Sequence, residues 1–84
     1  MELPAWWNWE LVYTEHVESR MEERGVSDVD LRTMLENALS IQPGRPGRWQ
    51  VDARHADRRW AIVLEPDFED RLVFVVTVYP RDES

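Results

Sequence analysis

The sequence predicts an α+β domain in which two helices pack on one face of an antiparallel β-sheet of three to four strands. The hydrophobic period changes from about 3.6 to about 2 residues near residue 47, so a helical half precedes a strand half. A Pro- and Gly-rich stretch at 43–47 marks the boundary. The chain has 84 residues, 43% of them hydrophobic, which fits one domain over residues 1–84. The Trp-rich residues 1–9 are its N-terminal extension.

The first helix is expected at residues 15–24, after a short strand at 9–13. Thr14 is a favoured N-cap residue type, because its side-chain oxygen can accept a hydrogen bond from a free N–H of the first turn. Gly25 follows the last turn, where a left-handed backbone costs glycine little. Met21 lies on the apolar stripe of this helix, and we expect it in the core.

The second helix is expected at residues 28–39, with Ser27 as its N-cap. Apolar side chains recur at helical spacing along it, and they are Leu31, Met34, Leu35, Ala38 and Leu39. The helix is therefore amphipathic and should pack on a flat surface. Residues 43–47 then form a loop.

Three strands are expected in the second half, at residues 48–54, 59–65 and 71–79, with a hairpin loop at 66–70. The first of them alternates apolar and polar residues, which is typical of a strand with one solvated face. The last strand is apolar on both faces, so we expect it inside the sheet. The strand at 9–13 is a candidate neighbour on its far side.

The residue types exclude several kinds of site. The chain has no cysteine, so it has neither disulfides nor thiolate metal sites. Its two histidines, His16 and His55, lack the spacing of a metal-binding motif. We therefore expect no metal and no cofactor. The sequence has neither a membrane-spanning apolar run nor a signal peptide, so we expect a cytoplasmic protein without a membrane partner.

The charge distribution limits contact with nucleic acid. The net charge is −7, and all ten basic residues are arginines, whereas nucleic-acid binders normally carry a basic surface. Residues 1–37 hold nine carboxylates and three arginines. Residues 45–59 hold five arginines and two aspartates, which gives a local charge of +3. RNA is thus a candidate partner through this Arg-rich patch alone, and a basic protein is a candidate partner for the acidic remainder.

The first helix carries a candidate site at His16, Arg20 and Arg24. Residues four apart lie along one side of a helix, so the three side chains form a stripe at the rim of the core. Imidazole can transfer a proton, and guanidinium can stabilise the negative charge that develops on a phosphate. Alternatively, Arg20 pairs with Glu23 and His16 is simply solvated.

A second candidate site is the turn between the first two predicted strands. It contains three arginines and the other histidine, namely Arg54, His55, Arg58 and Arg59. Guanidinium groups can bind phosphates through bidentate contacts. Alternatively, the segment is a charged hairpin tip that opposes aggregation at the sheet edge.

The end of the last strand adds a phenol and a further arginine. Tyr79 and Thr77 point to one face of the predicted strand, and Arg81 follows just beyond its end. Tyr79 and Arg81 can complete a cleft beside the Arg-rich turn. Alternatively, they only end the strand.

Two stretches resemble a known family. The helical motif His-x-x-x-Arg-Met-x-x-Arg-Gly-Val-Ser at residues 16–27 and the strand Val-Phe-Val-Val-Thr-Val-Tyr at 73–79 are similar to a small bacterial family of unknown function. That family is grouped with RelE/ParE-like toxins of the barnase–colicin–RelE ribonuclease fold. The resemblance extends from Tyr13 to Tyr79. It implies a RelE-like helical hairpin on an antiparallel sheet, with metal-free RNA cleavage or toxin activity.

The leading hypothesis is a toxin-type, metal-independent endoribonuclease that uses the 2′-hydroxyl of its substrate as the nucleophile. The residues assigned to catalysis are His16, Arg20, His55 and Tyr79, with His16 or His55 as the acid or base. The residues assigned to substrate binding are Arg24, Arg54, Arg58, Arg59 and Arg81, and Arg54 and Arg58 would hold the phosphate together with Arg20. The alternative is a non-enzymatic acidic interaction module on the same fold. It would bind an antitoxin-like or basic protein, or act as a nucleic-acid decoy.

Overall fold

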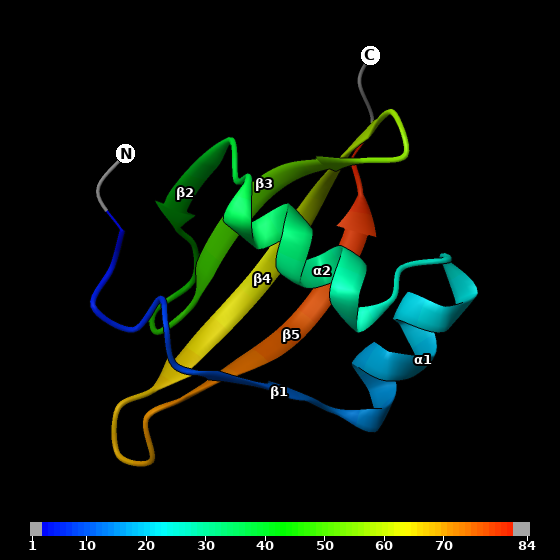
Figure 1. The fold of residues 1–84 in the computed structure, drawn as a ribbon. Helices are drawn as coiled ribbons and strands as arrows, with labels where there is room; N and C mark the ends of the chain where they lie inside the picture. Colours follow the sequence, from blue (N-terminus) through cyan, green and yellow to red (C-terminus); the bar gives the residue numbers. More distant parts are fainter. Residues whose placement is uncertain (1–2, 82–84) are drawn as a thin grey trace.

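The computed structural model describes residues 3–81, which form two helices and five strands (Figure 1). In chain order the elements are β1 (Glu10–Tyr13), α1 (Glu15–Glu23), α2 (Asp28–Glu36), β2 (Ser40–Pro43), β3 (Trp49–His55), β4 (Arg58–Asp67) and β5 (Leu72–Pro80). The strands make one sheet in the order β1-β5-β4-β3-β2. The α+β class with two helices is confirmed, but the predicted three to four strands were too few.

The sheet is mixed, whereas the sequence predicted an antiparallel one. β1 pairs with β5 in parallel, with Leu11 opposite Val73, and the other neighbouring strands are antiparallel. In the sequence, both helices come between β1 and β2, which are the two edge strands of the sheet. The helical segment therefore connects one edge of the sheet to the other, and β2 to β5 then follow as an antiparallel meander. The alternation of side chains reports which face of a strand is buried, but it is the same for both strand directions, so it could not predict this pairing.

The start and end of α1 follow the predicted capping signals. The Thr14 hydroxyl accepts a hydrogen bond from the Val17 N–H at 3.2 Å. Gly25, with φ of +70°, adopts the left-handed conformation after the helix. At α2, Ser27 forms a capping box with Asp30. The backbone N–H and the side chain of Ser27 lower the pKa of the Asp30 carboxyl.

The predicted second helix was too long, because α2 ends at Glu36 rather than near residue 39. The Asn37 side chain donates to the Thr33 carbonyl at 2.9 Å and covers the helix end. The Leu39 N–H instead donates to the Asp52 carbonyl at 2.8 Å, so the chain already turns into the sheet, and Leu39 is 48% exposed. Pairing with β3 therefore overrides the helical spacing of Leu39.

The missed strand is β2, at the sheet edge. It ends at Pro43, whose missing N–H is tolerated on an edge strand. Such a short segment ending in proline carries no strand signal of its own. The predicted loop at 43–47 begins one residue later and is closed by a hydrogen bond from the Gly44 N–H to the Arg48 carbonyl at 2.9 Å. The other predicted strands lie within two residues of the observed ones, and the hairpin loop after β4 begins only at Phe68.

The core lies between the two helices and one face of the sheet. Fully buried side chains come from both layers, including Val17, Leu31, Val51, Ile62 and Val75. β5 lies between β1 and β4, so the predictions of an interior last strand and of its N-terminal neighbour are confirmed.

The Trp-rich segment before β1 contributes to the same core. Trp6 is only 3% exposed. Its ring centroid lies 5.8 Å from that of Trp7 and 5.7 Å from that of Trp49 on β3. An indole ring buries a large apolar area, so this segment is part of the packed structure.

Alanine substitutions should separate the two faces of the helices. Met21 is 4% exposed and Leu35 is 9% exposed, so Met21→Ala and Leu35→Ala should each lower the free energy of unfolding by about 2–5 kcal/mol. Glu22 is exposed, and Glu22→Ala should change it by less than about 0.5 kcal/mol. Urea unfolding of the three variants measures this difference. Equal midpoints would contradict the assigned faces.

Candidate functional site

The face of the sheet opposite the helices carries several polar side chains of the strands. Among residues 3–81, both helices pack on the same face (Figure 1). Val51 and Ala53 of β3 are fully buried under them, and side chains alternate along a strand. Gln50, Asp52 and Arg54 therefore point to the opposite face, which we call the open face.

Three arginines lie side by side at one end of the open face. Arg54 of β3 is directly opposite Arg59 of β4 in the strand register. The Arg81 N–H donates to the Arg59 carbonyl at 2.8 Å, so Arg81 extends the ladder next to β4. We call Arg54, Arg59 and Arg81 the arginine row. Like charges on adjacent strands repel each other, so a bound anion would stabilise the arginine row.

Asp52 anchors one member of this row. It is only 4% exposed, and its carboxylate lies 2.9 Å from the guanidinium of Arg81. Ser40 and Gln50 also donate hydrogen bonds to this carboxylate, at 3.3 and 3.2 Å. A buried charge needs such partners. Asp52 thus fixes the direction of Arg81, and sequence reasoning missed it because alternation placed it on a solvated face.

Two features leave hydrogen-bond donors near the arginine row. The Nε of Arg59 is buried and has no protein partner within residues 3–81. Tyr79 is half-buried and pairs with Ala61, which is itself opposite Asp52. Tyr79 and Arg81 are two residues apart along the chain, and two residues of a strand span about 7 Å. The Tyr79 side chain therefore lies on the open face next to Arg81 of the arginine row.

His55 and Arg58, the other two residues of the predicted site at the β3–β4 turn, lie on the opposite face of this hairpin from Arg54 and Arg59. The His55 ring packs edge-on against Trp60 at 5.9 Å, and the Trp60 indole N–H donates to the His55 carbonyl at 3.0 Å. The guanidinium of Arg58 lies 5.8 Å from the centre of the Trp60 ring, a cation–π contact. The turn between them is tight, because Ala56 and Asp57 both have positive φ. His55 and Arg58 therefore face the helix side.

The predicted stripe on α1 does not join the open face. His16 and Arg20 are exposed, and the Arg20 guanidinium lies 3.8 Å from the Glu23 carboxylate. Arg24 is half-buried and donates to the Val78 carbonyl of β5. α1 packs on the helix side of the sheet, and its Arg24 contacts the backbone of β5, whereas the arginine row points to the open face.

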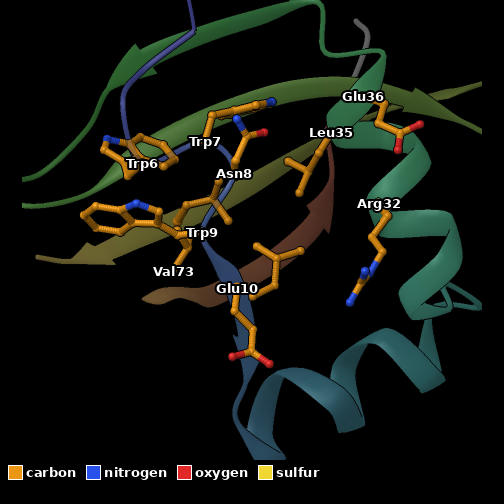
Figure 2. Close-up of a pocket in the computed structure, with 11 residues that line it drawn as sticks. Trp6, Trp7, Asn8, Trp9, Glu10, Arg32, Leu35, Glu36 and Val73 are labelled. Carbon is orange, nitrogen blue, oxygen red and sulfur yellow. The ribbon is translucent and has the colours of Figure 1, made fainter. Parts of the chain in front are cut away.

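A pocket of about 450 Å³ lies on the helix side, between the Trp-rich segment and α2 (Figure 2). Its walls are tryptophan and aliphatic side chains, and its charged residues are Glu10, Arg32 and Glu36. Arg32 also lies near Tyr13, whose phenol has a pKa raised by burial against the opposing effect of Arg32. No residue assigned to the site from sequence lines this pocket. We therefore place the candidate site on the open face.

Residues 3–81 contain neither a metal-binding cluster nor a helix that could span a membrane. No group of three histidine, aspartate or glutamate side chains is placed to hold a metal ion there. None of the described helices is long and apolar enough to cross a membrane.

The fold and the open face define the class of this protein: a small α+β domain with a row of cations on a helix-free sheet face. Residues 13–84 match the family described as a domain of unknown function, DUF4258. The match covers most of the chain, and the chain belongs to this family. The prediction of a family of unknown function is confirmed to that extent, and the description of the matched family does not link it to RelE/ParE-like toxins. No curated protein and no solved structure matches the chain.

Proposed function

We propose that this protein is a metal-independent endoribonuclease of the RelE/ParE-like toxin type, which binds RNA on the open face. The observation that carries the proposal is the arginine row beside Tyr79. Arg54 and Arg59 come from one hairpin, and the pairing of β5 with β4 brings Tyr79 and Arg81 to them from a distant part of the chain. Three guanidinium groups and a phenol suit a phosphate, because they can neutralise its charge and donate a proton to it.

The arginine row supplies the binding step. Arg54 and Arg81 are exposed, so both can reach a phosphate. Arg59 is half-buried, so part of its side chain is also accessible to a phosphate, although its Nε is buried and has no protein partner within residues 3–81. Asp52 neutralises only part of the row, through Arg81. The row therefore keeps a net positive charge.

The chemistry follows from the same groups. The 2′-hydroxyl of the substrate gives its proton to water and attacks the adjacent phosphorus, so that the bond from phosphorus to the 5′-oxygen breaks and a 2′,3′-cyclic phosphate forms. Negative charge develops on the phosphate oxygens during this step. Guanidinium groups of the arginine row stabilise that charge. The hydroxyl of Tyr79 donates a proton to the departing 5′-oxygen. This assignment moves the proton-transfer role from His16 and His55, which lie on the helix side, to Tyr79.

The acidic interaction module is the second candidate, and the distribution of charge favours it. Residues 15–36, which include both helices, hold seven carboxylates and three arginines. Both helices lie on one face of the sheet (Figure 1), and strand register places the arginine row on the other face. A basic protein, including an antitoxin-like one, would bind to the helix layer.

RNA binding should depend on the arginine row. Arg54→Ala/Arg59→Ala should weaken binding of a single-stranded RNA and lower the slope of log affinity against log salt by about 2, because each phosphate contact contributes about 1. Fluorescence anisotropy over a range of salt concentrations measures both. The control Arg32→Ala/Arg71→Ala changes the net charge equally, but neither arginine belongs to the row, so it should bind RNA more tightly than the first variant.

Two outcomes would decide against the proposal. Equal affinities and slopes for the two double variants would show that binding follows net charge and not the open face. Absence of RNA binding by the wild type, together with binding of a basic protein that is lost on charge reversal of Glu18 and Glu22, would support the interaction module.

A further inference from the structure

A smaller pocket lies on the open face, next to the loop between β2 and β3. Its volume is about 240 Å³. The loop side is formed by Arg45 and Arg48, and the floor by side chains of β3, β4 and β5. The loop is held by two hydrogen bonds that join Gly44, Arg45 and Arg48. The pocket is therefore part of the ordered hairpin.

A β-bulge shapes the floor. Val63 pairs with Thr77 and Leu64 pairs with Val75, so Val76 is an extra residue without a partner on β4. A bulge bends the strand and redirects its side chains. Val63 and Val76 consequently form an apolar wall, and Thr77 lines the pocket next to them in the chain.

Gln50 and Thr77 are the uncharged polar residues of this pocket, and both can form hydrogen bonds with a ligand. The Gln50 amide nitrogen donates to the Asp52 carboxylate at 3.2 Å, which can only accept. This contact leaves the Gln50 side-chain carbonyl oxygen as an acceptor for a ligand. Thr77 can donate or accept. The pocket therefore offers at least one acceptor next to an apolar wall.

The arginines of the loop provide planar, charged surfaces. The Arg48 guanidinium is held by Glu65, with Nε 3.1 Å from the carboxylate. Arg45 is exposed at the rim. Guanidinium planes stack on nucleobases of single-stranded RNA. An apolar wall, a stacking cation and an amide acceptor together suit a nucleobase.

We propose that this pocket binds a nucleobase with an exocyclic amino group, as part of an RNA strand whose phosphate lies on the arginine row. The inference rests on the proposed function. Gln50 and Arg54 are four residues apart on β3, a span of about 13 Å, so a strand of a few nucleotides covers both sites. Adenine, cytosine and guanine carry an exocyclic amino group that can donate to the Gln50 oxygen, whereas the only base donor that uracil offers within an RNA strand is its ring N3–H.

The test compares three single-stranded RNA oligonucleotides of equal length, made of adenosine, cytidine or uridine. The wild type should bind the first two about five-fold more tightly than oligouridine, which corresponds to one net hydrogen bond. Gln50→Ala should abolish this preference, so that the three oligonucleotides bind with equal affinity. Gln42→Ala is the matched control, because Gln42 lies opposite Gln50 on β2 but does not line the pocket.

Nuclear magnetic resonance separates this inference from the proposed function. Adenosine monophosphate should shift the methyl signals of Val63 and Val76, and uridine monophosphate should shift them less. Thr77→Val, which keeps the shape of the side chain, serves as a second variant and should weaken adenosine monophosphate binding about five-fold.

Two results would overturn the inference. One is RNA binding that depends on the arginine row, with no base preference and no Val76 shift, which would leave the proposed function standing. The other is a preference for oligouridine. If RNA does not bind but adenosine monophosphate shifts Val63 and Val76, the pocket stands and the proposed function fails.

Discussion

Trp6→Ala is expected to lower the free energy of unfolding by about 3–5 kcal/mol, the range for removal of a buried aromatic side chain. Trp6 is 3% exposed and packs against Trp7 and Trp49. Its position is notable because residue 6 precedes the range 13–84 that matches the family. A large effect would show that this domain includes the Trp-rich segment.

Urea unfolding followed by far-ultraviolet circular dichroism measures this effect. Trp7→Ala is the matched control, since Trp7 is only half-buried and its loss exposes less core. We expect a clearly smaller change for that variant. Similar unfolding midpoints for wild type and Trp6→Ala would mean that the N-terminal segment is not packed as described.

Tyr79→Phe is expected to slow RNA cleavage by about 10²–10⁴-fold, the usual contribution of a general acid or base. The substitution removes only the hydroxyl, so the fold and the arginine row should be retained. RNA affinity should therefore change little, and the loss should fall on the chemical step. Single-turnover cleavage of a labelled RNA measures that step directly.

The same assay should be run with and without a chelator. Wild-type cleavage should survive EDTA, because the proposed mechanism uses only guanidinium groups, a phenol and the substrate hydroxyl. Cleavage that stops with EDTA would contradict the mechanism. Loss of cleavage in His16→Ala, with full activity in Tyr79→Phe, would instead return the proton-transfer role to α1.

The helices were predictable where their signals are local. Thr14, Ser27 and Gly25 lie within a few residues of the backbone groups that they satisfy, so their residue types suffice to predict where helices start and stop. The end of α2 was not predictable in this way. There the Leu39 N–H donates to the carbonyl of Asp52, thirteen residues further along the chain. The spacing of apolar residues around Leu39 cannot predict a hydrogen bond to so distant a partner.

The candidate site was predictable only in part. Residue types alone indicated Arg54, Arg59, Tyr79 and Arg81 as groups that can handle phosphate. The local sequence could not show that Arg58 points to the other face of the sheet. Adjacent residues of a strand point to opposite faces, and a shift of the strand by one residue exchanges the two faces. Asp52 was missed for a related reason, since its main partner is 29 residues away.

The sequence by itself determined the α+β class, the capped helix starts, the interior position of the last strand and the presence of an Arg-rich segment. These features follow from side-chain period, capping chemistry and composition, all of which act over a few residues. Only the tertiary structure decided the fifth strand, the parallel pairing of β1 with β5 and the separation of the arginine row from both histidines. Strand register decides these features, because hydrogen bonds between distant segments bring particular side chains to one face of the sheet.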